Sequence, residues 1–388
     1  MTRIYLDHAA TTPARPEAIA AMLPLLDAGG YNPSSLHAEG RAARAALDAA
    51  RATVAGVLGA RPREIVFTGG GSESIVLGIV GAARARAAHG KHVVTSSIEH
   101  HAVLHAVETL EGEGWSVTRL PVDARGLVSV AEFRAALRPD TVLASVMLAN
   151  NEIGSVQPVA ELAAIARERG VLFHTDAVQA PGHLPLDVGA LGIDLLSISA
   201  HKFYGPKGVG VLYVRGGTAI APLIVGGGQE HGLRAGTENV AGIAGLASAL
   251  ALAERERPAT AARLAALRDG LESAVTAAVP DVVVNGAGAP RLPHVSSLAI
   301  AGAAADVLLI RLDLAGISAS AGSACAAGSL EPSHVIAALG LPDTSSRGMI
   351  RFSLGRATTD EQIAHVVGML PELIAGVRGA PSPETNVR

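Results

Sequence analysis

Seven short apolar runs alternate with alanine-rich stretches between residues 61 and 214, and this alternation limits the possible folds more than any other feature of the chain. Short runs rich in Val, Leu and Ile are typical of buried β-strands. The stretches between them have helical periodicity, and several end in Gly or Pro. The alternation therefore predicts an α/β fold with a mostly parallel, seven-stranded sheet flanked by helices. The strand candidates are EIVFTG (64–69), KHVVTSS (91–97), WSVTRLPV (115–122), TVLASVML (141–148), VLFHTDA (171–177), DLLSISA (194–200) and GVGVLYV (208–214).

The pattern changes after residue 214, where a loop-like segment, GGGQEHGLRAGTENV, leads into a helix that we expect to end near Glu256. After Pro258 the sequence predicts a separate amphipathic helix over 261–279, because proline disfavours a helix interior. The chain has 388 residues, more than one hydrophobic core usually serves. We therefore predict two domains: a large α/β domain over 16–256, and a small α+β domain made of 1–15 and 257–388.

Composition and charge exclude several classes of function. Hydrophobic residues make up 49% of the chain and charged residues 17%, which indicates a globular protein and not a disordered one. A net charge of −4 gives no strong basic field for nucleic acid or anionic lipid. The longest apolar uncharged run, 240–253, is shorter than the ~18 residues of a membrane span, and MTRIYLDHAATTP has no apolar signal-peptide core. We expect a cytoplasmic protein with no direct nucleic-acid contact and no membrane segment.

Polar residues follow five of the predicted strands, at the sheet edge where ligands bind in open α/β folds. In TGGGSES (68–74), Gly71 lets the backbone approach an anion, the start of the next helix adds positive potential, and Ser72 offers a hydroxyl. This turn suits a phosphate group. The alternative is a tight turn with a serine helix cap, and the segment is not a P-loop because Gly-Lys-Ser/Thr is missing.

Lys202 and Asp176 follow two of these strands. A partly buried lysine has a lowered pKa and becomes a usable amine nucleophile. Asp176, at a buried strand end, is either a helix N-cap or a partner for a protonated ring nitrogen. A lysine amine, a carboxylate and a phosphate turn are the three parts that pyridoxal 5'-phosphate needs, so we predict this cofactor with Lys202 as its covalent partner.

Other polar residues at this edge keep two interpretations each. His100 and His101 are either hydrogen-bonded polar residues or, for one of them, a ring that lies on the planar cofactor and exchanges protons. Asn151 and Gln179 are either loop hydrogen-bonders or partners of a phenolic oxygen on the same ring.

Cys325 is the only cysteine, so no intrachain disulfide is possible. It lies in SASAGSACAAGSLEPSHV, among Ser, Gly and Ala, whereas a structural cysteine usually lies in an apolar strand or helix. A thiol on an accessible loop can act as a thiolate nucleophile. The segment therefore leaves a catalytic and a structural role open.

Ten motifs in the same order carry a resemblance to a known family. They are YLDHAATTP, NPSSLHAEGR, TGGGSES, EHHAVL, ANNEIGSVQP, HTDAVQAPG, SAHKFYGPKGVG, GGGQEHGLRAGTEN, GSACAAGSLEPSHV and IRFSLGRATT. Over nearly its whole length the chain resembles the cysteine desulfurases of the NifS/IscS type, in the class-V aminotransferase group of fold-type-I pyridoxal-phosphate enzymes. GSAC followed by SLEPSHV resembles the group with the longer cysteine loop. The resemblance implies the fold-type-I α/β architecture.

The resemblance also implies a role for each matching position. Lys202 corresponds to the lysine that holds the cofactor, Cys325 to the persulfide-forming cysteine and His100 to the ring-stacking residue. Arg356 corresponds to the arginine that binds the substrate carboxylate, and Thr237 to a phosphate contact made in the other subunit of a homodimer. The remaining cofactor contacts implied are Asp176 at the ring nitrogen, Asn151 and Gln179 at the phenolic oxygen, and Gly71, Ser72, Ser199 and His201 at the phosphate.

The implied activity is the removal of sulfur from L-cysteine, which gives L-alanine and a persulfide on Cys325. The persulfide is then passed to an acceptor protein, either an iron–sulfur scaffold or a tRNA-thiolation protein. No metal site is implied beyond transient ligation of a cluster by Cys325. The alternatives are a selenocysteine lyase or aminotransferase on the same fold, and a non-catalytic sulfur-assembly scaffold. Two departures from the family pattern are Ile75-Val76, where the family commonly has asparagines, and Ala326-Ala327, where Thr-Ser is frequent.

Overall fold

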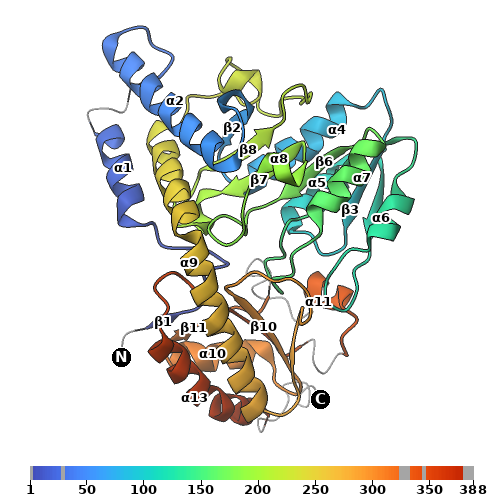
Figure 1. Cartoon of the computed structure of the whole chain (residues 1–388), viewed down its shortest axis with the longest axis vertical. Coiled ribbons are helices and arrows are strands. Elements are labelled where there is room, and N and C mark those ends of the chain that lie inside the picture. The colour runs from blue at the N-terminus through green and yellow to red at the C-terminus, as the bar shows by residue number, and fades with distance from the viewer. Residues whose placement is uncertain (1–2, 28–30, 323–332, 343–346, 379–388) are drawn as a thin grey trace, which may run out of the picture.

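A seven-stranded sheet forms the centre of the larger part of the protein. The computed structural model describes residues 3–27, 31–322, 333–342 and 347–378 (Figure 1). The strand order is β2-β8-β7-β6-β5-β3-β4, and only β8 runs antiparallel to its neighbours, because its connection from β7, residues 200–209, is a loop with one short 3-10 helix and no crossover α-helix. The predicted mostly parallel sheet is confirmed. Its strands are β2 (Ile65–Thr68), β3 (His92–Ser96), β4 (Ser116–Leu120), β5 (Thr141–Ser145), β6 (Leu172–Asp176), β7 (Leu195–Ser199) and β8 (Gly210–Val214).

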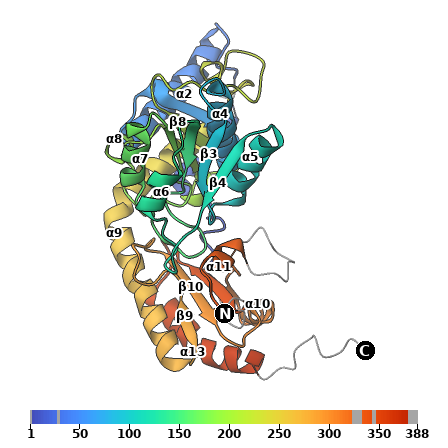
Figure 2. The ribbon, with the colours of Figure 1, turned by 90° about the vertical axis from the view of Figure 1, so that its right-hand side faces the viewer.

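Helices cover both faces of this sheet, which explains why its strands are continuous apolar runs. On β2, Ile65 and Phe67 belong to one hydrophobic core and Val66 to the other. Figure 2 shows α6 and α7 on one side of the strands and α5 on the other. One face carries α2 (Ala38–Leu58), α6 (Val130–Ala136), α7 (Val159–Glu168) and the first half of α9 (Val240–Ala278). The other carries α3 (Gly71–Val76), which continues through a π-helical turn, η2 (Leu77–Gly81), into α4 (Ala82–Ala85), and α5 (His101–Gly112). The remaining elements of this part are α1 (Pro16–Leu26), α8 (Val188–Leu191), η1 (Pro62–Glu64) and η4 (Glu230–Gly232).

A second sheet with its own hydrophobic core forms the smaller part. The sheet is antiparallel, in the order β12-β10-β9, and the N-terminal strand β1 pairs in parallel with β11 beside it. This core combines Ile4 and Leu6 with residues from 264 to 377. The separation of the cores supports the predicted domain boundary near residue 256, which stays a prediction. The elements are β1 (Ile4–Tyr5), β9 (Val282–Val284), β10 (Val295–Ile300), α10 (Ala305–Leu314), β11 (Ile317–Ser318), α11 (His334–Ala338), β12 (Met349–Ser353) and α13 (Asp360–Arg378).

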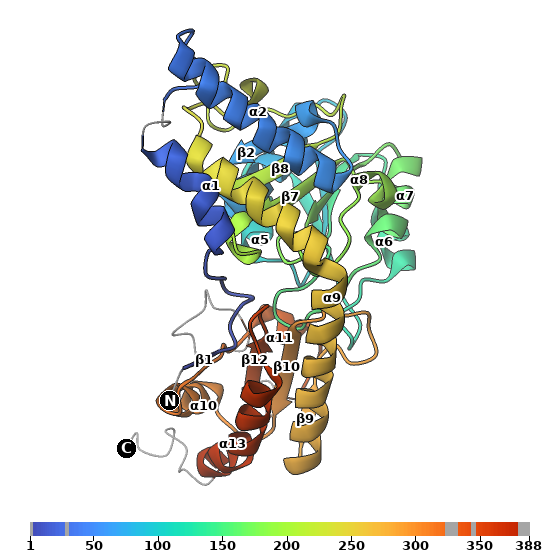
Figure 3. The ribbon, with the colours of Figure 1, turned by 60° about the vertical axis from the view of Figure 1, so that its left-hand side comes forward.

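Helix α9 connects the two cores without interruption, so the prediction of two separate helices at Pro258 was wrong. Proline removes one main-chain hydrogen bond and kinks a helix, and Figure 3 shows α9 bent between its two halves. Each half is held by tertiary packing, since Leu246 and Leu250 lie in the large core while Leu264 and Leu271 lie in the small one. Burial at both ends outweighs the local cost of Pro258.

No helix in the described ranges is both long and apolar enough to cross a bilayer.

Two histidine rings stack where the two cores meet. His183 follows β6 in the large part and His294 precedes β10 in the small part, with ring centroids 3.6 Å apart and an interplanar angle of 15°. No described residue hydrogen bonds to the buried Nδ1 atom of either ring. Burial lowers the pKa of His183 to about 3 and that of His294 well below its ordinary value. Both rings are therefore neutral at physiological pH, and this contact between the two parts depends on neutrality.

We expect the His183–His294 contact to make the fold sensitive to acid. Below pH ~6.5 the unfolded chain takes up protons at these rings and the folded chain does not, so stability present above that pH is lost as pH falls. For His183, whose pKa in the folded protein is about 3, the loss is about 2 kcal/mol at pH 5. Urea unfolding at pH 8 and pH 5 should show a smaller pH effect in His183→Gln than in the wild type. His89→Gln, at an exposed position, controls for the loss of a histidine, and an equal pH effect in wild type and His183→Gln would contradict the expectation.

Candidate active site

One cavity of about 270 Å³ collects the polar residues predicted at the strand ends. It opens at the carboxyl ends of β5, β6 and β7, where ligands bind in α/β sheets. The predicted residues that line it are Gly71, Ser72, His100, Asn151, Asp176, Gln179, Ser199, His201 and Lys202.

Lys202 is held at the end of η3 (Ala200–Lys202) by the N-terminal segment of the chain. Its Nζ donates to the carbonyl oxygens of Ala9 (2.6 Å) and Ala10 (2.8 Å). The Ala9 oxygen also accepts from Nε2 of Gln179 at 3.0 Å. Two main-chain carbonyls therefore hold the amine at the cavity wall, and Gln179 hydrogen bonds to one of those carbonyls.

Asp176 lies at the end of β6 and is buried, so its ionised form requires hydrogen bonds or a nearby positive charge. Its Oδ1 accepts from the Val178 amide at 2.9 Å. Burial raises the pKa of Asp176 to about 6, and the hydrogen bond and the Lys202 charge only partly offset that effect. A protonated ring nitrogen beside this carboxyl would restore its ionised form.

The start of α3 forms a cradle for an anion. Gly70 precedes this helix and offers no side chain to cap the N–H groups of the first turn. A Cβ atom on Gly71 would lie 3.1 Å from Val178 Cγ2 and 3.2 Å from Ser199 Cβ, so any side chain there would fill the cradle. Ser72 and Ser199 also line the cavity, and Ser199 Oγ lies 3.7 Å from that Cβ position. These donors and the helix start suit a phosphate group.

Two neutral histidines complete the polar wall. Nδ1 of His100 accepts from the Ala102 amide at 3.1 Å, which leaves Nε2 as the nitrogen that carries the proton of the neutral ring. Burial and the Lys202 charge lower the pKa of His100 to about 4. Burial likewise lowers the pKa of His201 to about 4, and its Nδ1 lies 3.0 Å from Thr11 Oγ1. Neither ring brings a positive charge to the site at neutral pH.

The cavity also contains residues that the sequence analysis did not assign to the site. Ile75, Met147, Ala149 and Val178 supply apolar walls that suit the faces of a planar ring. Ala9 and Ala10 come from YLDHAATTP, a motif to which we gave no role in the site. Nothing in their residue types indicates a role, because they act through carbonyl oxygens.

Arg351, and not Arg356, lines the cavity. Arg351 is 1% exposed, and its guanidinium donates to the Asn151 carbonyl (2.8 Å) and to Asp7 Oδ1 (2.8 Å). Its buried Nε has no hydrogen-bond partner among the described residues. Arg356 is exposed, and its guanidinium lies 5.6 Å from the ring centroid of Tyr204, beside a different pocket.

Two further predicted residues lie outside the cavity or outside the described ranges. Thr237 is exposed and does not line the site of its own chain. Cys325 lies outside the described residues. Among the described residues, no group of three or more His, Cys, Asp or Glu side chains could hold a metal ion.

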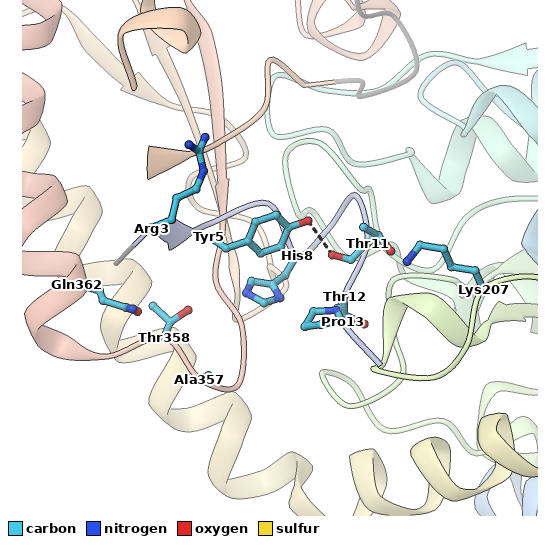
Figure 4. A pocket seen from close by; sticks show the side chains of 10 residues that line it. All are labelled: Arg3, Tyr5, His8, Thr11, Thr12, Pro13, Lys207, Ala357, Thr358 and Gln362. Atoms are coloured by element: carbon cyan, nitrogen blue, oxygen red, sulfur yellow. Dashed lines mark hydrogen bonds between the residues drawn. The ribbon is translucent and has the colours of Figure 1, made fainter. Parts of the chain in front are cut away.

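A second, more open pocket of about 440 Å³ lies on the other side of the N-terminal segment. Figure 4 shows Tyr5 and His8 on one side of it and Lys207 on the other, with the Tyr5 hydroxyl donating to the Thr11 carbonyl (3.0 Å). None of its lining residues is a predicted site residue. Thr11 lines this pocket and its neighbour Ala10 lines the first, so the N-terminal segment contributes to the walls of both.

Comparison with known proteins gives the same family along the whole chain. Residues 4–366 match the model of the aminotransferase class-V family. The chain is 49% identical over 375 residues to the cysteine desulfurase IscS of Dictyoglomus turgidum, covering 97% of this chain and 95% of that protein. It is 48% identical over 375 residues to the cysteine desulfurase IscS of Methanosarcina thermophila, covering 97% and 93%.

Solved structures are similar in fold as well. A NifS-like protein superimposes with a TM-score of 0.91 at 35% identity, covering 97% of this chain and 100% of that one. A structure described as SspA in complex with cysteine gives a TM-score of 0.81 at 37% identity, covering 92% and 100%. The fold is therefore that of the fold-type-I enzymes, as the sequence predicts.

Proposed function

Because the chain belongs to the class-V aminotransferase family, and within it to the cysteine desulfurases of the NifS/IscS type, we propose that it takes sulfur from L-cysteine and releases L-alanine. The observation that carries the proposal is the arrangement of Lys202 and Asp176 in one cavity with an anion cradle. Such a set fits a cofactor with an aldehyde, a ring nitrogen and a phosphate. Class-V aminotransferases generally depend on pyridoxal 5'-phosphate, and we propose this cofactor here.

The residues of the cavity fit several parts of this group. Lys202 would hold the cofactor covalently through Nζ, and Asp176 would pair with its ring nitrogen. Ser72, Ser199 and the start of α3 would bind its phosphate. Asn151 and Gln179 would face the phenolic oxygen, and His100 would lie on the ring. When bound, the cofactor withdraws electrons from the substrate Cα and so makes the Cα proton acidic.

The chain's own residues then bind the substrate and move its protons. The Arg351 guanidinium, buried on the cavity wall, would bind the cysteine carboxylate, since a planar fork matches a carboxylate. This assignment replaces Arg356, which lies outside the cavity. Lys202 Nζ, once released, would accept the Cα proton. His100 is neutral above pH ~4 with its proton on Nε2, so it would face the ring as a neutral hydrogen-bond donor and bring no positive charge.

The sulfur is taken up by Cys325. Its thiolate attacks the substrate sulfur, the new sulfur–sulfur bond forms, and the bond between that sulfur and the substrate Cβ breaks. The electron pair stays with the substrate carbon, which is protonated and leaves as alanine. The persulfide passes to an acceptor protein, an iron–sulfur scaffold or a tRNA-thiolation protein. We place the reaction in the cytoplasm, where reducing conditions keep a single thiol reactive.

We propose a homodimer, supported by an apolar stripe on α1. Ile19, Leu23 and Leu26 are 44%, 58% and 64% exposed, and their spacing of four and three residues places them on one helix face. The buried face of the same helix packs on α9, so the stripe points away from the core. Exposed apolar stripes of this kind mark interaction surfaces. Thr237, exposed and outside its own cavity, would reach the phosphate of the partner subunit.

Lys202→Ala should abolish alanine release and remove the absorption of the covalently held cofactor near the visible edge.

Cys325→Ala should keep that absorption and still bind cysteine, but release almost no alanine, because nothing attacks the sulfur. Absorption spectra and alanine assays check both variants. Alanine release by Cys325→Ala at the wild-type rate would refute the desulfurase and favour an aminotransferase or lyase.

Arg351→Lys should lower kcat/KM for cysteine by about 10- to 100-fold, the effect of losing a charge-assisted hydrogen bond to a carboxylate. Arg356→Lys, the matched control five residues away, should change it less than about threefold, since that side chain is outside the cavity. Steady-state kinetics of the two variants decide which arginine binds the substrate carboxylate. Thermal unfolding of each variant checks that it is folded. A larger effect of Arg356→Lys would restore the original assignment.

Leu23→Asp should dissociate the dimer, because it places a charge in the centre of the α1 stripe. Ile310→Asp, on α10, replaces an equally exposed apolar residue (61%) away from the stripe and should leave the dimer intact. Sedimentation velocity measures both. A wild-type protein that is monomeric and fully active at working concentration would contradict the proposal that two subunits share each site.

A further inference from the structure

The turn that leads to His100 contains one fully buried carboxyl group, that of Glu99. His100 lines the cavity and caps the start of α5, and residues 97–99 connect it to the end of β3. Glu99 is 0% exposed and is not among the residues that line the cavity. No step of the proposed reaction uses this carboxyl group, so its burial requires another explanation.

Two hydrogen bonds to Oε1 of Glu99 fix the turn. Ser96 Oγ, at the end of β3, donates to this oxygen at 2.6 Å, and the Met147 amide, just after β5, donates to it at 2.9 Å. β3 and β5 are neighbours in the sheet, and Met147 is an apolar wall residue of the cavity. One oxygen atom therefore ties the residue next to His100 to a wall of the same cavity.

Two further bonds hold the same turn. Asn150 Nδ2 donates to the Ile98 carbonyl at 2.9 Å, while Asn150 Oδ1 accepts from the two amides of residues 152–153 at 2.8 and 3.0 Å. His334 Nε2, from the small part, lies 2.8 Å from the main-chain oxygen of Glu99. The turn is thus bonded to the large sheet and to the small part, which restricts the position of the residue that follows it.

The carboxyl group of Glu99 is mainly protonated at neutral pH. Burial raises its pKa to about 8, although the Ser96 and Met147 hydrogen bonds lower it, and the charge of Asp176 adds to the rise. No described residue hydrogen bonds to its Oε2 atom. A neutral carboxyl accepts both hydrogen bonds at Oε1 without placing a second negative charge near Asp176. A glutamine side chain offers the same acceptor in a neutral group of similar shape.

We propose that Glu99 is a positioning residue for His100, an inference that rests on the proposed place of His100 on the cofactor ring. His100 Nδ1 accepts from the Ala102 amide, so the imidazole is already bound to the start of α5. The position of the His100 main chain depends on the turn before it, which Glu99 bonds to β3 and to Met147. Loss of this hold should displace the imidazole and slow the reaction, while cysteine still binds at Arg351.

The test uses three variants of the turn in the cofactor-loaded enzyme. Glu99→Leu removes the acceptor of the Ser96 and Met147 bonds, whereas Glu99→Gln keeps it. Asn150→Asp keeps the oxygen that binds the amides of 152–153 and removes only the donor to Ile98. Asn150→Asp therefore remains informative if Glu99→Leu does not fold.

Two matched controls remove the same kinds of bond away from the cavity. Glu64 is 5% exposed and accepts from the Arg61 and Gly216 amides, both at 2.8 Å, just before the start of β2. Glu64→Leu therefore removes a buried acceptor at the sheet edge opposite the carboxyl ends of the strands. Asn285→Asp removes a buried donor to Ser297 Oγ (3.0 Å) in the small part.

Each change is measured in the wild type and in His100→Ala. In the wild type, Glu99→Leu and Asn150→Asp should lower kcat for alanine release about tenfold, with half-saturation by cysteine within about threefold. In His100→Ala the same changes should lower kcat less than about twofold, because a residue that acts through His100 has nothing left to position. Glu99→Gln, Glu64→Leu and Asn285→Asp should stay within about threefold of the wild type.

Circular dichroism of the cofactor band gives a readout that does not depend on turnover, since it reports the surroundings of the bound ring. Glu99→Leu should change this band in the same direction as His100→Ala, and Glu99→Gln should leave it unchanged. Urea unfolding of each variant measures any general loss of stability separately.

Wild-type kcat and an unchanged cofactor band in both Glu99→Leu and Asn150→Asp would overturn the inference. An equal loss in the two controls, or an undiminished loss in His100→Ala, would overturn it too, because neither effect passes through His100. Glu99→Gln as slow as Glu99→Leu would show that an ionised carboxylate is needed, against the proposed role.

The wild type separates this inference from the proposed function. If the wild type holds no pyridoxal phosphate or makes no alanine from cysteine, the proposed function fails and the positioning role fails with it. An active wild type with unaffected Glu99 variants refutes only the positioning role.

Discussion

The buried guanidinium of Arg351 joins the small sheet, the large part and the N-terminal segment of the protein. It comes from β12 in the small sheet and donates to Asn151 in the large part and to Asp7 in the N-terminal segment. A charge buried this deeply needs hydrogen-bonding partners, or its desolvation would outweigh the gain from folding. Three segments far apart in the sequence are therefore held around one cation, at the wall of the cavity.

The N-terminal segment gains its importance from this arrangement. Asp7 pairs with Arg351, and the next residues present the carbonyl oxygens of Ala9 and Ala10 to the Lys202 amine. The Ala9 amide in turn donates to Ser353 Oγ at 2.9 Å. A segment that pairs with the small sheet thus holds Lys202 of the large part. Movement between the two parts would therefore displace the carbonyl oxygens that bind Lys202 Nζ.

Much of the fold and the site could be predicted because their signals are local. A strand buried on both faces is a continuous apolar run, and polar residues after such strands share one edge of the sheet. Lys202 and Asp176 are therefore placed together by sequence alone. Arg351 and Arg356 could not be distinguished, because both lie in IRFSLGRATT and only the register of β12 turns the first one inward. The prediction of a helix break at Pro258 was wrong for a related reason. The local free-energy cost of this proline is outweighed by packing at both ends of α9.

By itself, the sequence determined the strands of the large sheet and the edge of that sheet where the polar residues of the cavity gather, because periodicity and residue type act over a few neighbours. The tertiary structure decided which arginine faces the cavity and which carbonyl oxygens hold Lys202. These facts depend on contacts between residues up to hundreds of positions apart. Only the packing of one sheet against the other specifies such contacts.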